Sequence, residues 1–243
     1  MSKKLQLLQI GENIVPLVIR YEIRSSLRVS FGREVINVRI PKQMGLSIVE
    51  EQYKLAKDWI TKTFEGKPTL YRQYAIKQYN KKSIAVMGDH YNLYVTKEAR
   101  ITGSITTKNG DCRIKIPKDM SIFDESQMIR KLLSRGLSSL YIDQIRKEVH
   151  DVNNLHFGKP INQVRLKYNK SNWGSCSSKG NINLSSRLLL VPRHIRQYVI
   201  VHELAHLIEM NHSAKYWKVV EQVYPSYKLA ENWLKDNSSL VDF

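Results

Sequence analysis

Three of the chain's seven histidines lie in one short stretch, VIVHELAHLIEMNHSAKYW, at residues 199–217. His202 and His206 are four residues apart, which on a helix places both imidazoles on one face, one turn apart. Imidazole nitrogens at this spacing are common ligands of a small cation with tetrahedral preferences, such as zinc. Glu203 projects to the side of the pair, where its carboxylate can hold a metal-bound water without being a ligand. The spacing predicts a metal site with a catalytic base beside it.

Two histidines do not complete a zinc shell, so a third ligand must come from outside the same helical face. His212 is the preferred candidate, because Asn211 tolerates the left-handed conformation that ends helices and Ser213 is a suitable N-cap for a following helix. The fourth position would be left to water, as in catalytic zinc sites. The acidic alternatives to His212 are Glu209, Glu221 and Glu231, of which Glu231 ranks next.

A histidine pair of this kind also arises by chance in amphipathic helices, where single histidines are core or surface groups. Here bulky apolar residues flank the pair and can exclude water from it, and a third histidine follows at a workable distance. This combination favours a metal site over an ordinary core helix. Pro192 marks the start of the helix, and residues 193–210 contain no other breaker, so a helix of about 18 residues is expected.

The segments just before the histidine helix predict a β-hairpin. INQVRLKY and WGSCSSKGNINLS are strand-like pieces, and Lys-Gly-Asn supplies a turn. Trp173, Gly174 and Ser175 are candidate substrate-binding residues, since an exposed edge strand beside the site could pair with an extended peptide. The alternative is that the hairpin only packs against the helix, with Trp173 in the core.

The rest of the chain predicts strands and two helices. Residues 15–40 alternate apolar and charged residues, as an antiparallel meander would, and residues 70–116 contain strand-like runs that would extend the same sheet. Between them, SIVEEQYKLAKDWITKTFEG predicts an amphipathic helix that opens with a capping box from Ser47 to Glu50. Helical periodicity from Ser121 to about Asn154 predicts a long helix between the two halves.

The composition is strongly basic: 39 Lys and Arg against 22 Asp and Glu, a formal net charge of +17. Such an excess favours polyanionic partners, nucleic acid or nucleoprotein, although it could equally be spread over solvated faces. Cys112 and Cys176 have no paired spacing, which indicates unpaired thiols in a reducing compartment. No secretory signal and no membrane span is recognisable, so we expect a soluble, cytoplasmic protein without a membrane partner.

Several motifs resemble those of the YgjP-like metal-dependent hydrolases, which are zincin-like and related to the SprT and WLM proteases. The specific ones are WGSCSSKGNINLSSRLLLVP, YVIVHELAHLIEMNHSAKYW and YPSYKLAENWLK; RVSFGREVINVRIPK and KDWI match more weakly. The resemblance implies one zinc ion per chain on His202, His206 and His212, with Glu203 as the catalytic base. Asn172 stands where the family usually has a basic residue, which puts anion binding by the Trp-Gly-Ser-Cys segment in doubt. Glu209 replaces the glycine of metzincins, so membership of that clan is not supported.

The resemblance and the element pattern together predict an α+β fold. It has an antiparallel β-rich N-terminal region at residues 1–118 and a zincin-like region at residues 119–243, with the active-site helix on a small sheet, or one continuous domain. The leading functional hypothesis is a zinc metallopeptidase that cleaves peptide bonds by Glu203-assisted attack of zinc-bound water, with protein, peptide or nucleic-acid-associated protein as substrate. The alternatives are a metal-dependent nucleotide or phosphoester hydrolase, and a nucleic-acid-binding module with a structural metal. Nucleophilic catalysis by Ser175 or Cys176 is disfavoured, because no histidine outside the metal set lies in an obvious partner motif.

Overall fold

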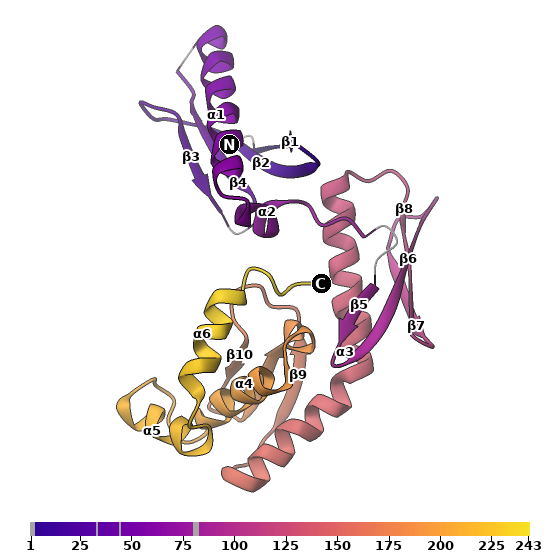
Figure 1. Cartoon of the computed structure of the whole chain (residues 1–243), viewed down its shortest axis with the longest axis vertical. Helices are drawn as coiled ribbons and strands as arrows, with labels where there is room; N and C mark the ends of the chain where they lie inside the picture. The colour runs from indigo at the N-terminus through magenta and orange to yellow at the C-terminus, as the bar shows by residue number, and fades with distance from the viewer. Residues whose placement is uncertain (1–2, 33, 44, 80–82) are drawn as a thin grey trace. The chain divides into compact units, whose positions relative to one another are not determined.

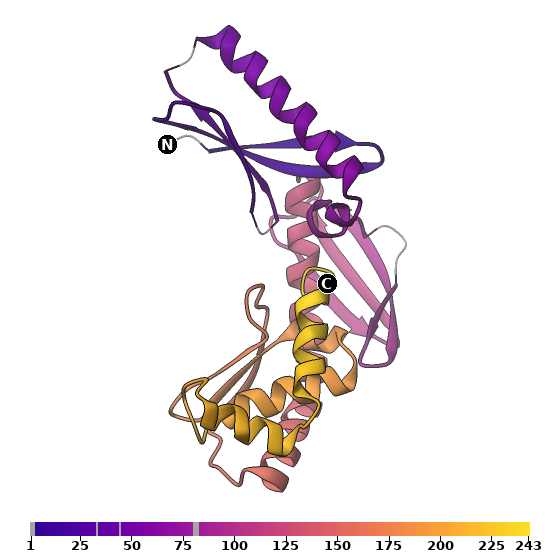
Figure 2. The same cartoon turned by 60° about the vertical axis from the view of Figure 1, so that its left-hand side comes forward.

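The computed structural model describes residues 3–32, 34–43, 45–79 and 83–243. The chain divides into two compact units, residues 1–78 and 79–243. This division falls earlier than the 118/119 boundary that the sequence pattern suggested, because the strands after residue 82 pack with the long helix rather than with the first sheet. The α+β architecture with a long helix and a small C-terminal sheet is confirmed (Figures 1 and 2). No helix among the described residues is both long enough and apolar enough to cross a membrane.

The first unit is a four-stranded sheet with helices α1 and α2. Its strands have the order β1-β2-β4-β3, and their bounds are β1 Lys3–Ile10, β2 Asn13–Glu22, β3 Arg28–Phe31 and β4 Ile36–Pro41. The β3–β4 pair is antiparallel, as predicted, and so is the β1–β2 pair, whose first strand lies outside the predicted meander, but β2 and β4 are parallel. The expected wholly antiparallel meander is therefore wrong at one pairing, since β3 takes the edge of the sheet and β4 returns beside β2.

Helix α1 (Leu46–Gly66) ends where the sequence predicted but begins one residue earlier than the expected capping box. Gly45 is its N-cap and makes no side-chain capping bond, so Ser47 lies inside the first turn. The helix buries Ala56, Ile60 and Phe64, which follow one another at intervals of four, against the sheet. A short helix, α2 (Thr69–Tyr74), follows.

The second unit contains two sheets joined by one helix. The strands expected to extend the first sheet form a separate one, in the order β5-β6-β8-β7: β5 Ser83–Val86, β6 Asp89–Glu98, β7 Ser104–Lys108 and β8 Asp111–Pro117. Helix α3 (Ile122–His156) begins at the N-cap Ser121, whose hydroxyl accepts from the Asp124 amide. It packs on β7 and β8 and also on β9, so that one hydrophobic core runs through the unit.

The third sheet, in the order β10-β11-β9, supports the histidine stretch. Its strands are β9 Gln163–Lys167, β10 Gly174–Cys176 and β11 Asn181–Ser185, followed by a short 3-10 turn at Ser186–Leu190. Strands β10 and β11 form the predicted antiparallel hairpin. Helices α4 (Arg193–Ala205), α5 (Ala214–Val223) and α6 (Tyr227–Asn237) complete the unit, and α4 contacts both strands of the hairpin.

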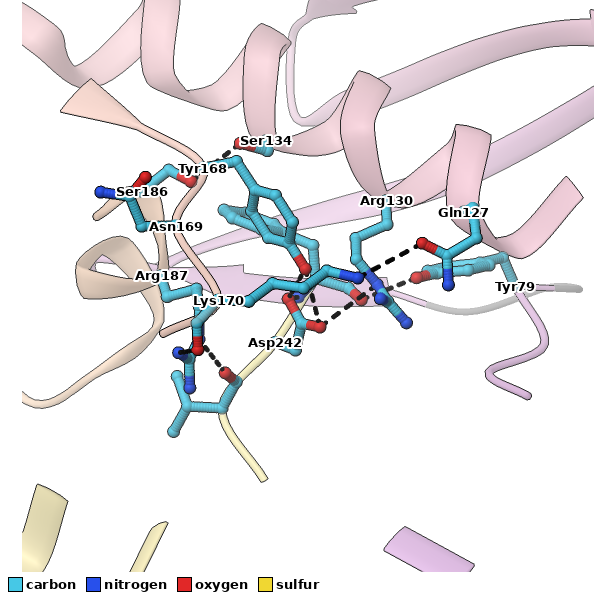
Figure 3. Close-up of polar contacts among 12 residues, drawn as sticks. Tyr79, Gln127, Arg130, Ser134, Tyr168, Asn169, Lys170, Ser186, Arg187 and Asp242 are labelled. Carbon is cyan, nitrogen blue, oxygen red and sulfur yellow. Dashed lines mark hydrogen bonds and ion pairs between the residues drawn. The ribbon is translucent and has the colours of Figure 1, made fainter. Parts of the chain in front are cut away.

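A polar cluster fixes the residues after α6 to α3 and to the third sheet (Figure 3). The Tyr168 hydroxyl donates to the Asp242 carboxylate at 2.9 Å, and Arg130 on α3 forms an ion pair with the same carboxylate at 3.2 Å. The buried Arg187 guanidinium donates to the Val241 carbonyl at 2.7 Å and to the Lys170 carbonyl at 3.1 Å. The last residues thus belong to the folded unit rather than to a loose tail.

Candidate metal centre

Helix α4 carries the first two histidines, but it is shorter than the sequence predicted. It begins directly after Pro192 and ends at Ala205, so that His206 is the C-cap, still with right-handed helical dihedral angles. The next amides bond three residues back, Leu207 to Leu204 and Ile208 to Ala205, which tightens and ends the helix before residue 210. His206 therefore keeps its place one turn beyond His202.

His212 arrives from the start of the next helix rather than through a left-handed turn. Asn211 is not among the residues with positive φ in the described part of the chain, so the predicted left-handed conformation is wrong. Instead the Ser213 amide donates to the Asn211 carbonyl at 2.7 Å, and Ser213 is the N-cap of α5, as expected. Its hydroxyl accepts from the Tyr216 amide at 3.3 Å. This tight turn directs the preceding imidazole toward α4.

The three imidazoles converge on one point. One ring nitrogen from each of His202, His206 and His212 lies within 4.8 Å of the other two. The Nε2 atoms of His202 and His212 are 3.2 Å apart. Two nitrogens bound to a tetrahedral zinc ion at about 2.0–2.1 Å would be roughly 3.3 Å apart, so the observed spacing fits such an ion. None of the three alternative carboxylates belongs to this group.

Burial holds the imidazoles of His202 and His206 in the neutral form that a metal requires. Burial, helped by the neighbouring His206 and His212, lowers the pKa of His202 to about 4. Burial also lowers the pKa of His206. Near neutral pH both rings therefore keep a free lone pair, and no proton has to be displaced for them to bind a cation.

The outer nitrogens of the first two imidazoles have partners that fix their orientation. Nδ1 of His202 lies 3.4 Å from the Tyr198 hydroxyl, and burial, helped by the nearby Glu231 side chain from α6, raises the pKa of that hydroxyl. Nδ1 of His206 lies 3.2 Å from the backbone carbonyl of Glu209. With Nδ1 as the donor in both rings, Nε2 is left to face the cluster. Of the alternative ligands, Glu231 thus lies beside Tyr198, and Glu209 contacts His206 through its backbone carbonyl.

Tyr216 on α5 contacts all three histidines of the cluster. Its ring stacks on His206 at a centroid distance of 4.6 Å and meets His212 edge-on at 4.7 Å. Its hydroxyl donates to the His202 carbonyl at 2.9 Å. This tyrosine was not predicted as a site residue. Its position three residues after the N-cap Ser213 was the available signal, because it places the ring in the first turn of α5, next to His212.

Glu203 is buried beside the histidines, with 3% of its surface exposed. Its Oε2 has no hydrogen-bond partner among the described residues, and burial raises the pKa of the carboxyl group to about 8. A buried carboxylate with an unused oxygen is suited to hold a polar ligand and to accept a proton near neutral pH. The structure thus brings the predicted base to the predicted metal ligands.

A cavity of about 600 Å³ opens onto the cluster. Trp173, Gly174 and Ser175 line it, as does Glu231, so the candidate substrate residues do face the site. Trp173 also packs against the core and lies under the Arg187 guanidinium, 4.1 Å from the ring centroid. Trp173 is therefore at once a packing residue and part of the cavity wall, and substrate binding by the hairpin stays a prediction.

Cys176 also lines the cavity, and its environment disfavours a nucleophilic role. Burial and the nearby Glu203 carboxylate raise the pKa of its thiol to about 11. A thiol of that pKa carries almost no thiolate at neutral pH, and the thiolate is the reactive form.

Comparison with known proteins identifies a family of metallopeptidase domains. The model of the YgjP-like family, described as a metallopeptidase domain, matches residues 23–237. Among solved structures, the chain is similar to the metallopeptidase zymogen abylysin of Pyrococcus abyssi, with 27% identity over 38% of this chain and 93% of that chain, and a TM-score of 0.35. It is also similar to the zymogen jannalysin of Methanocaldococcus jannaschii, with 22% identity over 40% of this chain and 97% of that one, and a TM-score of 0.34.

At these TM-scores the two structural likenesses add nothing to the family assignment, and no curated protein matches the chain. The family model, in contrast, spans the hairpin, the histidine cluster and Glu203. The chain therefore belongs to the YgjP-like family of metallopeptidase domains.

Proposed function

We propose that the protein is a zinc-dependent peptidase that uses Glu203 as its general base. The observation that carries the proposal is the convergence of three imidazoles beside a buried carboxyl group whose Oε2 has no partner among the described residues. The family match supports a metallopeptidase, and the nitrogen-only ligand set favours zinc over the harder cations, which prefer oxygen.

Strand β10 offers the peptide a place to bind. The Trp173 carbonyl accepts from the Ser185 amide, and the Ser177 amide donates to the Asn181 carbonyl. Since hydrogen-bonded residues alternate along an antiparallel strand, the backbone groups of Gly174 and Cys176 face away from β11. Since β10 is an edge strand that lines the cavity, an extended substrate can pair with it and bring a peptide bond to the histidine cluster.

The proton transfers fall to Glu203. A bound zinc ion would acidify a water ligand and polarise the substrate carbonyl. Glu203 accepts a proton from the attacking water and returns it to the leaving amine, so a single carboxyl group acts first as a base and then as an acid. A pKa near neutrality suits both steps.

The cavity is poorly suited to the phosphoester alternative. Among the described residues that line it, Lys235 is the single lysine or arginine, whereas Glu203 and Glu231 are acidic. A phosphate group would bring further negative charge to these carboxylates without an arginine to pair with. A peptide, which is uncharged along its backbone, meets no such repulsion.

The test is peptide hydrolysis by the zinc-loaded full chain, read by mass spectrometry on an unstructured protein substrate and a peptide library. We expect wild-type cleavage that a chelator removes and zinc restores. Glu203→Gln should retain zinc and lose at least about 100-fold in rate. Glu221→Gln, the same change on the exposed face of α5, is the control and should cleave normally.

Two outcomes would contradict the proposal. Wild-type activity in Glu203→Gln rules out the carboxylate as base. Hydrolysis of nucleotides alone, abolished in Glu203→Gln, would assign the site to the phosphoester alternative.

A further inference from the structure

A second groove, of about 510 Å³, lies between α3 and β9 and shares no residue with the metal centre. The helix and the strand lie side by side in the second unit (Figure 1). Five basic residues line it, and no acidic residue does among those described. They are Lys131, Arg135 and Arg146 from α3, and Arg165 and Lys167 from β9.

The periodicity of each element aligns these cations in two rows. Lys131, Arg135 and Arg146 are separated by 4 and 11 residues, which places them on one face of α3. The row spans about 22 Å at a rise of roughly 1.5 Å per residue. On β9, Arg165 and Lys167 alternate with the inward-facing Val164 and Leu166, so both point outward on the same side.

Most of this charge is not neutralised within the protein. Arg146 pairs with the exposed Asp143 at 2.9 Å. Lys131, Arg135, Arg165 and Lys167 are exposed and have no ion-pair partner in the part of the chain that the structure describes. Four such side chains around one groove repel one another, and an anionic ligand would remove that repulsion.

The floor of the groove supplies hydroxyl groups. Ser134 is engaged with Ser186 at 2.8 Å, but the buried Oγ of Ser138 has no hydrogen-bond partner among the described residues. Both serines line the groove. A buried hydroxyl without a partner loses free energy that an oxygen atom of a ligand in the groove would restore.

We propose that this groove binds a nucleic-acid strand through its phosphates. A strand carries one charge about every 3.4 Å, so several phosphates fit along two rows of cations of this length. An acidic peptide has no fixed charge spacing, and the net charge of +17 favours a partner of high, regular charge density. The proposal goes beyond the peptidase function and does not depend on it.

The experiment is fluorescence anisotropy of a labelled 12-nucleotide oligothymidylate with the full chain, at a series of salt concentrations. The variant Arg135→Glu/Arg165→Glu should bind at least 10-fold more weakly than wild type and with a shallower salt dependence, since each lost phosphate contact reduces the slope by about 0.7. Arg135→Gln/Arg165→Gln removes the same two charges without reversing them. Unfolding curves for each variant show whether weaker binding comes from the lost charges or from a destabilised fold.

The control Lys108→Glu/Lys118→Glu makes the same charge change at exposed positions elsewhere in the second unit. It should bind like the wild type, within about 2-fold. Equal weakening in the control pair and the groove pair would overturn the proposal, because binding would then follow net charge alone. Binding of polyglutamate in place of the oligonucleotide, lost in the groove variants, would also overturn it. Glu203→Gln should bind the oligonucleotide normally, so a failed peptidase assay leaves this test intact.

Discussion

Gly174 lies directly against the side chain of Glu203. A β-carbon at position 174 would stand 2.4 Å from Oε1 and 2.7 Å from Cδ of that glutamate. Gly174 does not have a positive φ, so the position requires glycine for its small size and not for its backbone conformation. The edge strand and the proposed base are thus fitted to each other, and the hairpin determines where the carboxyl group can lie.

Gly174→Ala should therefore impair catalysis without removing the metal. The added methyl group must displace the carboxyl group, and a shift of about 1 Å in a reacting group can cost about 100-fold in rate. We expect kcat to fall by at least 10-fold, with zinc content and the unfolding midpoint close to those of the wild type. Gly66→Ala, the same change where an added β-carbon would meet nothing within 4 Å, is the matched control and should retain its kcat. Normal kcat in Gly174→Ala would show that the glycine does not position the base.

Tyr198 and Glu231 should tune metal affinity. Tyr198→Phe removes the hydroxyl next to Nδ1 of His202, and Glu231→Gln removes the negative charge beside that hydroxyl. Loss of such outer contacts typically costs 10- to 100-fold in metal affinity. Competition with a fluorescent zinc chelator measures this, with Tyr224→Phe on α5's C-cap as control. If Glu231→Gln instead lost all zinc while Tyr198→Phe kept it, Glu231 would be a ligand.

Glu203 should make the metal-free protein less stable as pH rises. Burial raises the pKa of its carboxyl group to about 8 from an ordinary 4.5, so between these values the folded state binds a proton that the unfolded state has lost. Its contribution to the unfolding free energy falls by up to about 1.4 kcal/mol per pH unit across that window and is constant above it.

Urea unfolding of chelated protein at pH 5 and pH 8 tests this. The difference in unfolding free energy between Glu203→Gln and wild type should shift in favour of the variant as pH rises. Glu221→Gln, at an exposed site, should show no such shift. Parallel pH profiles for wild type and Glu203→Gln would contradict the raised pKa.

Arg187 should couple the last residues of the chain to the wall of the cavity. Its guanidinium bonds to the carbonyls of Ser238 and Val241 while lying over the Trp173 ring. Arg187→Lys replaces the several N–H donors of the guanidinium by one ammonium group and leaves buried carbonyls without a donor. We expect the free energy of unfolding to fall by about 1–3 kcal/mol. Urea unfolding measures the loss, and faster proteolysis after α6 should accompany it. Unchanged stability and an unchanged rate of proteolysis in Arg187→Lys would show that Arg187 does not hold the last residues in place.

The sequence predicted the site better than the arrangement of the strands. The spacing of His202, His206 and Glu203 is local, and a helix converts such spacing directly into geometry. The same holds for α3, whose long apolar periodicity is confirmed. The N-cap Ser213 was likewise visible, because capping depends on residues next to each other in the chain.

Non-local pairing was not visible in the sequence. Alternating residues identify a strand but not its neighbour, so the parallel β2–β4 pairing and the separate second sheet could not be foreseen. The contacts of Tyr198 with Glu231 and of Arg187 with the end of the chain join residues more than 30 positions apart, and nothing in their local patterns signals them. The end of α4 was misplaced because no breaker residue marks it.

The most direct test of the central claim is metal content by elemental mass spectrometry, on tag-free full chain purified without chelator. We predict about one zinc per wild-type chain and much less than one in His212→Ala, because two imidazoles do not complete the site. His194→Ala, an exposed histidine at the start of α4, should keep the wild-type stoichiometry. Wild-type protein that takes up no zinc even when zinc is supplied, or His212→Ala protein that binds it fully, would contradict the three-histidine centre.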